Sequence, residues 1–144
     1  MSDTENVTTA SELFTADELD YVRSQKIVRL ATSRADGSRV DVAPLTAVFD
    51  GEHFRITGYD IAKTMKYFHI KANPNVALVW DDLASVEPWV ARGVKVHGRA
   101  HIEDAPDGRN NIVVEPLRKW SWGVNGPAFD RTGPQSTRSE RSPS

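Results

Sequence analysis

The 144-residue chain carries 18 Lys and Arg residues against 20 Asp and Glu residues, and this net charge of −2 gives no support to non-specific nucleic-acid binding by the whole surface. It has no cysteine, which excludes disulfides, thiolate metal sites and a cysteine nucleophile and is compatible with a reducing cytosol. No basic leader with an apolar segment and no long apolar run is present, so we expect a cytoplasmic protein that is not inserted in a membrane.

The two ends of the chain differ in composition from the middle. Residues 1–13 are polar and acidic, and residues 127–144 contain almost no aliphatic side chains, so we expect both segments to be disordered tails. One folded domain over residues 14–126 remains. A domain of that size is at the low end for self-sufficiency, so burial against a second copy of the chain would help to stabilise it.

The first predicted element of this domain is a short helix that begins after Thr15 and ends near Gln25. Thr15 and Glu18 have the spacing of a capping box, in which each side chain satisfies a backbone N–H group at the start of the helix. Three β-like segments follow over residues 27–34, 38–49 and 52–58, joined by Asp-Gly pairs. Glycine tolerates the positive φ of hairpin turns, so these segments are predicted to form a meander.

The second half of the domain is also mostly β-like. Strands are predicted over residues 74–83, 89–104 and 110–124, the first of them after a helix that Asn73-Pro74 ends. The total of about six strands and two helices, with long strands and glycine breaks, predicts a mainly β protein whose strands form a closed antiparallel barrel with flanking helices.

The predicted helix between the third and fourth strands, residues 61–72, has an unusual charge distribution. Ile61, Met65, Phe68 and Ala72 form one stripe that we expect to pack on the barrel, with Asp60 as the N-cap. Lys63 falls in the first turn, where the helix dipole already leaves a partial positive charge. An anion at this end, such as a phosphate, would make the lysine favourable. The alternative is an ordinary amphipathic helix with lysines on its wet face.

The sequence motifs of the common classes of enzyme are mostly missing. The sequence has no glycine-rich phosphate loop, no HExxH helix and no Gly-x-Ser-x-Gly elbow. His97 and His101 share a strand face but lie about 13 Å apart at strand rise, too far to hold one metal, and we expect no metal site. The alternating basic residues from Lys95 to His101 are either a solvated strand face or part of an anion-binding wall. An enzyme built this way would depend on a bound cofactor.

Specific motifs then connect the chain to a known family. Lys66 precedes Asn73-Pro74-Asn75-Val76 at the spacing of a phosphate-binding lysine and a strand start, and residues 79–89 (VWDDLASVEPW), 92–94, 98–100 and 120–123 (WSWG) add more specific matches. With these motifs, residues 14–124 resemble the flavin and deazaflavin split-barrel proteins of the pyridoxamine-phosphate-oxidase-like superfamily. More closely, they resemble the actinobacterial branch that uses coenzyme F-420 (8-hydroxy-5-deazaflavin), which includes dehydrotetracycline reductases.

The resemblance implies a six-stranded antiparallel FMN-binding-like split barrel that forms a homodimer, with the cofactor in a groove between subunits. The residues implied to bind the cofactor are Arg39, Asp41, Thr57, Gly58, Tyr59, Lys63, Thr64 and Lys66. Lys66 is expected to hold the phosphate, while Arg39 and Asp41 are expected at the ring or ribityl chain. Met65 replaces an arginine frequent in relatives, and Lys63 is expected to substitute for it.

The implied activity is a coenzyme F-420-dependent oxidoreductase that transfers a hydride between reduced deazaflavin and an electron-poor C=C, C=N or conjugated carbonyl of a small molecule. The catalytic residues are unknown, since no side-chain nucleophile is needed, and Tyr59 and His69 are candidate proton donors. Trp89, Trp120 and Trp122 are expected either to contact the substrate or to pack in the core. The segment with which true pyridoxamine phosphate oxidases hold their substrate is missing, which argues against that substrate.

Three alternatives remain open at this point. The same fold could bind FMN in place of F-420. It could also be a non-catalytic protein that carries a flavin or deazaflavin. A small barrel that binds single-stranded nucleic acid through Trp, Lys and Arg is a further alternative, disfavoured by the negative overall charge.

Overall fold

A computed structural model describes residues 4–7, 9–58, 60–106, 109–126 and 137–141. The strands are β1 (Thr4–Val7), β2 (Val28–Ser33), β3 (Val40–Leu45), β4 (Val48–Phe49), β5 (Phe54–Gly58), β6 (Asn75–Ser85), β7 (Val90–Asp104), β8 (Asn110–Trp122) and β9 (Thr137–Arg141). The helices are α1 (Ala10–Leu13), α2 (Ala16–Ser24), the 3-10 helix η1 (Ile61–Lys63) and α3 (Met65–Ala72). No helix in these ranges is long and apolar enough to cross a membrane.

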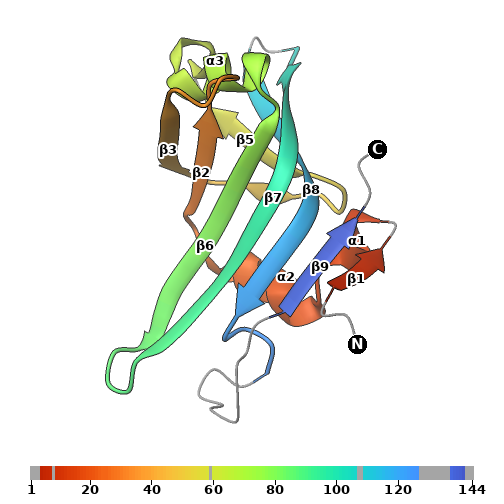
Figure 1. Cartoon of the computed structure of the whole chain (residues 1–144), viewed down its shortest axis with the longest axis vertical. Coiled ribbons are helices and arrows are strands. Elements are labelled where there is room, and N and C mark those ends of the chain that lie inside the picture. Colours follow the sequence, from red (N-terminus) through yellow and green to blue (C-terminus); the bar gives the residue numbers. More distant parts are fainter. Residues whose placement is uncertain (1–3, 8, 59, 107–108, 127–136, 142–144) are drawn as a thin grey trace.

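The long strands form one twisted sheet in the order β1-β9-β8-β7-β6-β2-β3, with β6 and β7 as a long hairpin that extends away from α3 (Figure 1). Strand β8 has two different partners on one edge. Its first half, Asn110 to Val114, pairs with β5, and its second half, Arg118 to Ser121, pairs with β9. This division confirms the predicted mainly β split barrel of antiparallel strands. The expected meander is wrong in one respect, because β5 does not pair with β3 and pairs instead with β4 and β8.

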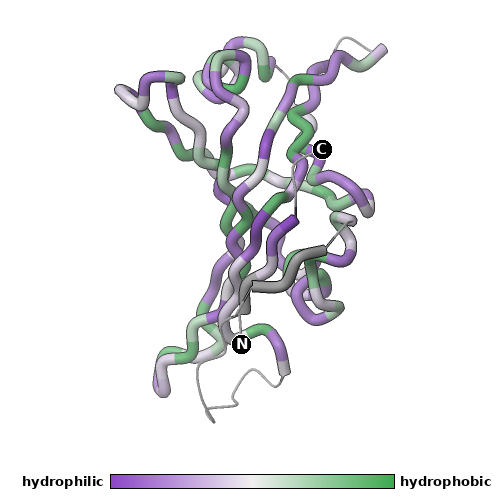
Figure 2. Tube along the Cα trace, turned by 45° about the vertical axis from the view of Figure 1, so that its right-hand side comes forward, coloured by the Kyte–Doolittle hydropathy of each residue, from purple (hydrophilic) through white to green (hydrophobic). Residues whose placement is uncertain are grey.

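Hydrophobic and hydrophilic residues alternate along the long strands (Figure 2), as expected for a sheet with one buried face. In β7, Val94 and Val96 are fully buried, whereas His97 and Arg99 are exposed. An aromatic cluster fills one end of the core, where the ring of Phe54 lies 5.0 Å from Trp80 and 5.7 Å from Phe14. The alternating basic residues from Lys95 to His101 therefore lie on the less buried face of β7.

A bulge in β8 reverses the direction of its side chains. His97 pairs with Arg118 and Gly98 pairs with Pro116, so Leu117 is the extra residue. Gly98 makes this close approach possible, since a Cβ there would lie 2.4 Å from the carbonyl oxygen of Glu115. After the bulge, Lys119 and Ser121 are buried, and Trp120 and Trp122 lie on the opposite face.

The two segments expected to be disordered contain secondary structure where the structure describes them. Strand β1 pairs in parallel with β9, which in turn pairs with β8. Helix α1 buries Ala10 and Leu13 against the sheet. The expectation is wrong for these residues, because strand pairing at the sheet edge uses backbone groups alone and because Leu13 joins the hydrophobic core.

Helix α2 begins as predicted. The Thr15 hydroxyl accepts from the Glu18 backbone N–H, and the Glu18 carboxylate accepts from the Thr15 backbone N–H at 2.8 Å. The capping box is confirmed, and so is the end of the helix at Gln25. The same carboxylate is also fully buried, where it bonds Lys119 and Ser121 of β8.

Candidate functional site

The helix predicted over residues 61–72 is two helices. The 3-10 helix η1 ends at Lys63, and α3 begins after Thr64, whose extended backbone (φ −100°, ψ 157°) separates them. Lys66 therefore lies in the first turn of α3, and Lys63 precedes that helix. Asp60, the predicted N-cap, holds that position in η1 but its side chain makes no capping hydrogen bond, and Thr64 holds the N-cap position of α3.

The predicted buried stripe is also wrong in large part. Ile61 is buried, but Met65 is 44% exposed and Phe68 is 59% exposed. The residues that α3 buries are His69 and Ile70. The interruption at Thr64 changes the helical phase, so the residues before and after it no longer share one face.

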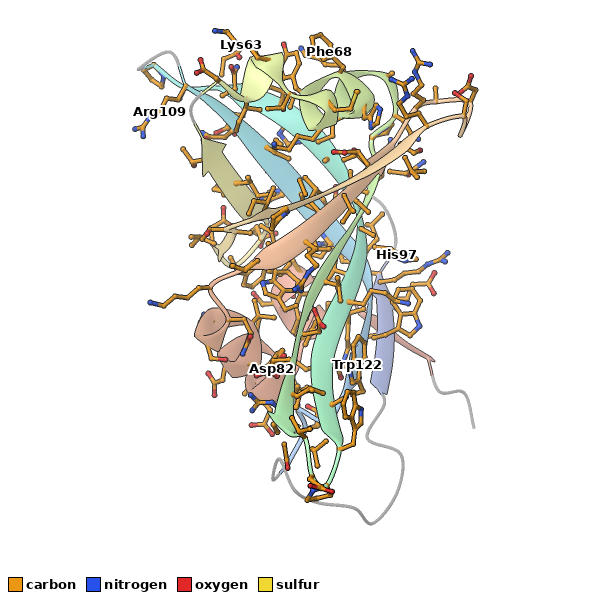
Figure 3. The ribbon with its side chains drawn as sticks, turned by 90° about the vertical axis from the view of Figure 1, so that its left-hand side faces the viewer. Lys63, Phe68, Asp82, His97, Arg109 and Trp122 are labelled. Carbon is orange, nitrogen blue, oxygen red and sulfur yellow. The ribbon has the colours of Figure 1, made fainter. Side chains whose placement is uncertain are left out.

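The start of α3 has the features of an anion site. No acidic residue lies in its first turn, and the N-cap residue Thr64 does not cap its first N–H groups, since the Thr64 hydroxyl donates to the Ile61 carbonyl oxygen at 2.6 Å. Lys63, labelled in Figure 3, is 81% exposed at this end of the molecule, and its ammonium lies 3.8 Å from the Asp60 carboxylate. A surface ion pair of that length is weak. Positive charge from two lysines and from the helix dipole therefore meets here without a strong counter-charge.

The end of β5 adjoins this helix start. Thr57 and Gly58 pair with Asn111 and Asn110 of β8, and a Cβ on Gly58 would lie 3.3 Å from the Ile61 side chain. Five of the expected cofactor residues thus lie along one continuous segment of β5, η1 and α3: Thr57, Gly58, Lys63, Thr64 and Lys66. Tyr59 lies outside the described residues.

Arg39 lies beside α3, and Asp41 lies on β3. Arg39 and the exposed Phe68 line the same pocket, and both are close to the turn between β2 and β3. Asp41 is half-buried and pairs with Thr32 of β2, so its side chain is on the barrel-facing side of β3. Their predicted role at the cofactor's ring or ribityl chain stays a prediction.

The sheet carries a larger pocket of about 520 Å³, which we call the sheet pocket. Its lining residues are Ala31, Thr32, Ser33, Val40, Asn75, Val76, Ala77, His97, Gly98, Leu117 and Arg118. The lining combines apolar side chains with the polar groups of Thr32, Ser33, Asn75, His97 and Arg118, a mixture that is found in small-molecule sites. His97 lies on the exposed face of β7, but its partial desolvation, together with the positive charges of Lys95 and Arg118, lowers its pKa. Sequence reasoning missed this pocket because its residues come from five strands, and only their pairing brings them together.

The three tryptophans expected near the substrate do not form one group. Trp120 and Trp122 lie on the same face of β8, and the ring of Trp120 contacts His97 with a centroid distance of 4.6 Å. The Trp122 ring covers Gly93, where a Cβ would lie 2.2 Å from it (Trp122 is labelled in Figure 3). Trp89 is 70% exposed in the turn between β6 and β7. Of the three, Trp120 is next to a residue of the sheet pocket, while Trp89 lies at the far end of the hairpin.

A buried hydrogen bond joins β2 to α3 and was not expected from the sequence. The imidazole Nδ1 of His69 lies 2.9 Å from the Thr32 hydroxyl, and His69 is only 3% exposed.

Among the described residues, no group of three or more His, Asp or Glu side chains could hold a metal ion.

Comparison with known proteins identifies the family. The sequence profile described as pyridoxamine 5'-phosphate oxidase matches residues 14–138. The chain belongs to the pyridoxamine 5'-phosphate oxidase family. A reductase of 5a,11a-dehydrotetracycline and 5a,11a-dehydrooxytetracycline from Streptomyces rimosus is 34% identical over 122 residues, which cover 78% of this chain and 85% of that protein.

Solved structures share the fold of this chain. An F-420 reductase matches with a TM-score of 0.59 and 25% identity, over 74% of this chain and 98% of that one. A conserved hypothetical protein from Mycobacterium tuberculosis matches with a TM-score of 0.64 and 20% identity, over 88% of this chain and 98% of that one. The resemblance stated from the motifs is confirmed, and the chain is an oxidoreductase of the pyridoxamine 5'-phosphate oxidase family.

Proposed function

We propose that this protein is a coenzyme F-420-dependent reductase that acts on a small molecule with an electron-poor C=C or C=N bond or a conjugated carbonyl. The start of α3 carries this proposal, because an uncapped helix N-terminus beside Lys63 and Lys66 suits the phosphate of such a cofactor. The identity to a reductase and the similarity to an F-420 reductase support the choice of cofactor.

The residues at this site match what a phosphate requires. Backbone N–H groups of the first turn of α3 would donate to its oxygens, and the ammonium groups of Lys63 and Lys66 would balance its charge. The Thr57 hydroxyl is exposed next to them and adds a further donor. The same groups would also accept the phosphate of FMN, so this site alone does not select between the two cofactors.

The protein's own part in the reaction is to position the reactants. When bound, reduced deazaflavin supplies a hydride to one atom of the substrate's electron-poor bond. The sheet pocket, with an apolar floor of Val40, Ala77 and Leu117, offers a surface that excludes water and orients a flat substrate. His97 at the pocket's rim has a lowered pKa, caused by burial, Lys95 and Arg118, so near neutral pH it can accept a hydrogen bond.

We propose that two copies of the chain form a homodimer through the β3 side of the sheet. Strand β3 is the last in the strand order, and Val40 and Val42 on it are 76% and 65% exposed. An edge strand with exposed apolar side chains is a site where another chain pairs or packs. Val40 also lines the sheet pocket, so a partner on this side would adjoin the proposed substrate site.

The test is a fluorescence titration of the purified protein with F-420 and, separately, with FMN. Lys66→Ala is expected to weaken F-420 binding by about 10- to 100-fold, since it removes a charge-assisted hydrogen bond. Lys71→Ala is the matched control in the last turn of the same helix and is expected to bind as the wild type does. Tighter binding of FMN than of F-420 would favour the FMN alternative, and no binding of either cofactor would refute the proposal.

A further inference from the structure

The sheet pocket is lined on one side by the guanidinium group of Arg118. This residue follows Leu117, the extra residue of the bulge in β8, and it pairs with His97 of β7. Paired residues of neighbouring strands point to the same face of a sheet, so the side chains of Arg118 and His97 lie side by side (His97 is labelled in Figure 3). Among the described residues, none of those that line the pocket is acidic. The pocket therefore has a positively charged side.

Strand β9 holds this guanidinium group in place. Glu140 of β9 pairs with Arg118, and a carboxylate oxygen of Glu140 lies 3.2 Å from the Nε atom of Arg118. The Arg118 side chain is 50% exposed, whereas that of Glu140 is 29% exposed. An arginine has five N–H donors in a rigid plane, and one carboxylate cannot use all of them. The ion pair thus fixes the orientation of the guanidinium group and leaves donors for a ligand in the pocket.

A second cation lies next to the pocket. The ammonium of Lys95 lies 4.6 Å from the centroid of the Trp120 ring, which in turn contacts His97. Partial desolvation lowers the pKa of His97, and the charges of Lys95 and Arg118 lower it further. His97 is therefore mostly neutral near neutral pH, and the positive charge that a ligand would meet comes from Arg118 and Lys95.

This charge suits the reduction of a conjugated carbonyl. When the β-carbon of such a substrate takes a hydride from reduced deazaflavin, the electron pair of the C=C bond moves toward the carbonyl carbon. The electron pair of the C=O bond moves onto the oxygen, oxidised deazaflavin is left, and a proton from solvent then completes the saturated product. A fixed donor beside the oxygen that gains charge lowers the barrier, because it binds the charged oxygen more strongly than the neutral carbonyl.

We propose that Arg118 stabilises the negative oxygen that forms when a conjugated carbonyl is reduced in the sheet pocket, and that Glu140 is the positioning residue for its guanidinium group. Hydrogen bonds from arginine to a charged oxygen are shorter and stronger than those to a neutral one. The inference rests on the proposed function for the source of the hydride. It narrows the substrate to conjugated carbonyls, and it gives the C-terminal strand β9 a part in the substrate site.

The experiment is a binding titration of the full-length protein, without cofactor, with para-nitrophenol and para-nitroanisole. The two probes have the same flat ring. Nitrophenol ionises near neutral pH to a yellow anion whose oxygen imitates the one formed in the reaction, whereas nitroanisole stays neutral. The wild type is expected to bind the anion about ten-fold more tightly than nitroanisole. The yellow absorbance is expected to increase on binding, since nearby cations lower the pKa of the bound phenol.

Three variants test the assigned roles. Arg118→Gln is expected to bind the nitrophenol anion about ten-fold more weakly than the wild type and to bind nitroanisole equally well. Arg29→Gln is the matched control, because Arg29 lies on the same face of the sheet and pairs with the Asp81 carboxylate but does not line the pocket. This control is expected to bind both probes as the wild type does. Glu140→Ala is expected to weaken binding of the anion, although it removes a nearby negative charge.

Each part of the proposal has a result that would overturn it. Equal affinity of the wild type for the two probes, or an Arg118→Gln protein that still prefers the anion, would exclude the role of Arg118. Tighter binding of the anion by Glu140→Ala would show that Glu140 acts only through its charge and does not position the arginine.

A parallel titration with F-420 separates this inference from the proposed function. Arg118→Gln is expected to bind F-420 as the wild type does, because Arg118 lies on β8 and not at the start of α3. A wild type that prefers the nitrophenol anion but binds no F-420 would refute the cofactor and not the anion site. A wild type that binds F-420 but shows no preference for the anion would refute the role of Arg118 and not the cofactor.

Discussion

The ammonium of Lys119 lies 2.6 Å from the carboxylate of Glu18, and both side chains are almost completely buried, with exposures of 1% and 0%. This ion pair joins helix α2 to the second half of β8. The bulge at Leu117 is what directs Lys119 inward to meet the helix. Ser121 also donates to the Glu18 carboxylate, so the buried charge has several partners.

The first prediction is that Lys119→Met lowers the free energy of unfolding by about 3–5 kcal/mol, because it leaves a buried carboxylate without its cation. Adding Glu18→Gln is expected to recover part of this loss, since glutamine carries no charge and can still complete the capping box. Urea unfolding of the single and double variants measures both effects. Arg29→Met, which breaks the half-exposed pair with Asp81, is the control and is expected to cost less than about 1 kcal/mol. A double variant less stable than Lys119→Met would contradict the account.

The second prediction concerns the stability of the folded protein at acid pH. Burial alone raises the pKa of Glu18, but hydrogen bonds from Lys119, Ser121 and the Thr15 backbone N–H outweigh it, and the pKa is lowered. A lowered folded-state pKa contributes stability that is complete above the unfolded value of about 4.3 and is lost as the pH falls through the folded-state pKa. The wild type is therefore expected to lose stability progressively below about pH 4.3. In the Glu18→Gln variant this part of the pH dependence is expected to disappear from thermal melts.

Most of the fold could be predicted from the sequence. Asp-Gly pairs mark the turns at Gly37 and Gly51, where φ is indeed positive, and alternation marks β7. The pairing of β5 with β8 could not be predicted, because a short strand that alternates apolar and polar residues, such as residues 54–58, fits beside many partners. The bulge at Leu117 could not be predicted either, since one extra residue leaves no local signal in the sequence. This bulge turns the side chain of Lys119 toward the core, where it is buried.

The candidate site was predicted less completely than the fold. The sequence marks Lys63 and Lys66 because their charges are unusual at a helix start. The sequence predicts the wrong buried face for this helix, since no residue pattern indicates the extended backbone at Thr64. Pockets that need several strands, such as the one shared by His97 and Val40, become visible only in three dimensions.

The third prediction tests the proposed homodimer. The wild type is expected to have twice the 16.0 kDa mass of one chain in light scattering after gel filtration. Val42→Lys places a charge on the exposed edge strand β3 and is expected to give the mass of one chain. Val48→Lys, an equally exposed valine on β4, is the matched control and is expected to keep the wild-type mass. A wild type that elutes with the mass of a single chain would rule out this interface.

The fourth prediction uses the contact between His97 and Trp120, whose ring centroids are 4.6 Å apart. A protonated imidazole quenches the fluorescence of an adjacent indole, so acid is expected to dim Trp120 as His97 gains its proton. Burial, Lys95 and Arg118 lower the pKa of His97, so the midpoint of quenching is expected below the ordinary value of about 6.5. His97→Gln is expected to remove the transition, and Trp120→Phe is expected to remove the signal that reports it.

The lowered pKa of His97 also has a consequence for the stability of the protein. A histidine whose pKa is lowered in the folded state binds its proton more tightly when the chain is unfolded, so acid favours unfolding from about pH 6.5 downward. Thermal melts of His97→Gln are therefore expected to depend less on pH between about 6.5 and 5 than those of the wild type. Lys95→Ala removes one of the cations that lower this pKa and is expected to move the fluorescence midpoint upward, toward the ordinary value. A downward movement in Lys95→Ala would show that the lysine does not act on His97 through its charge.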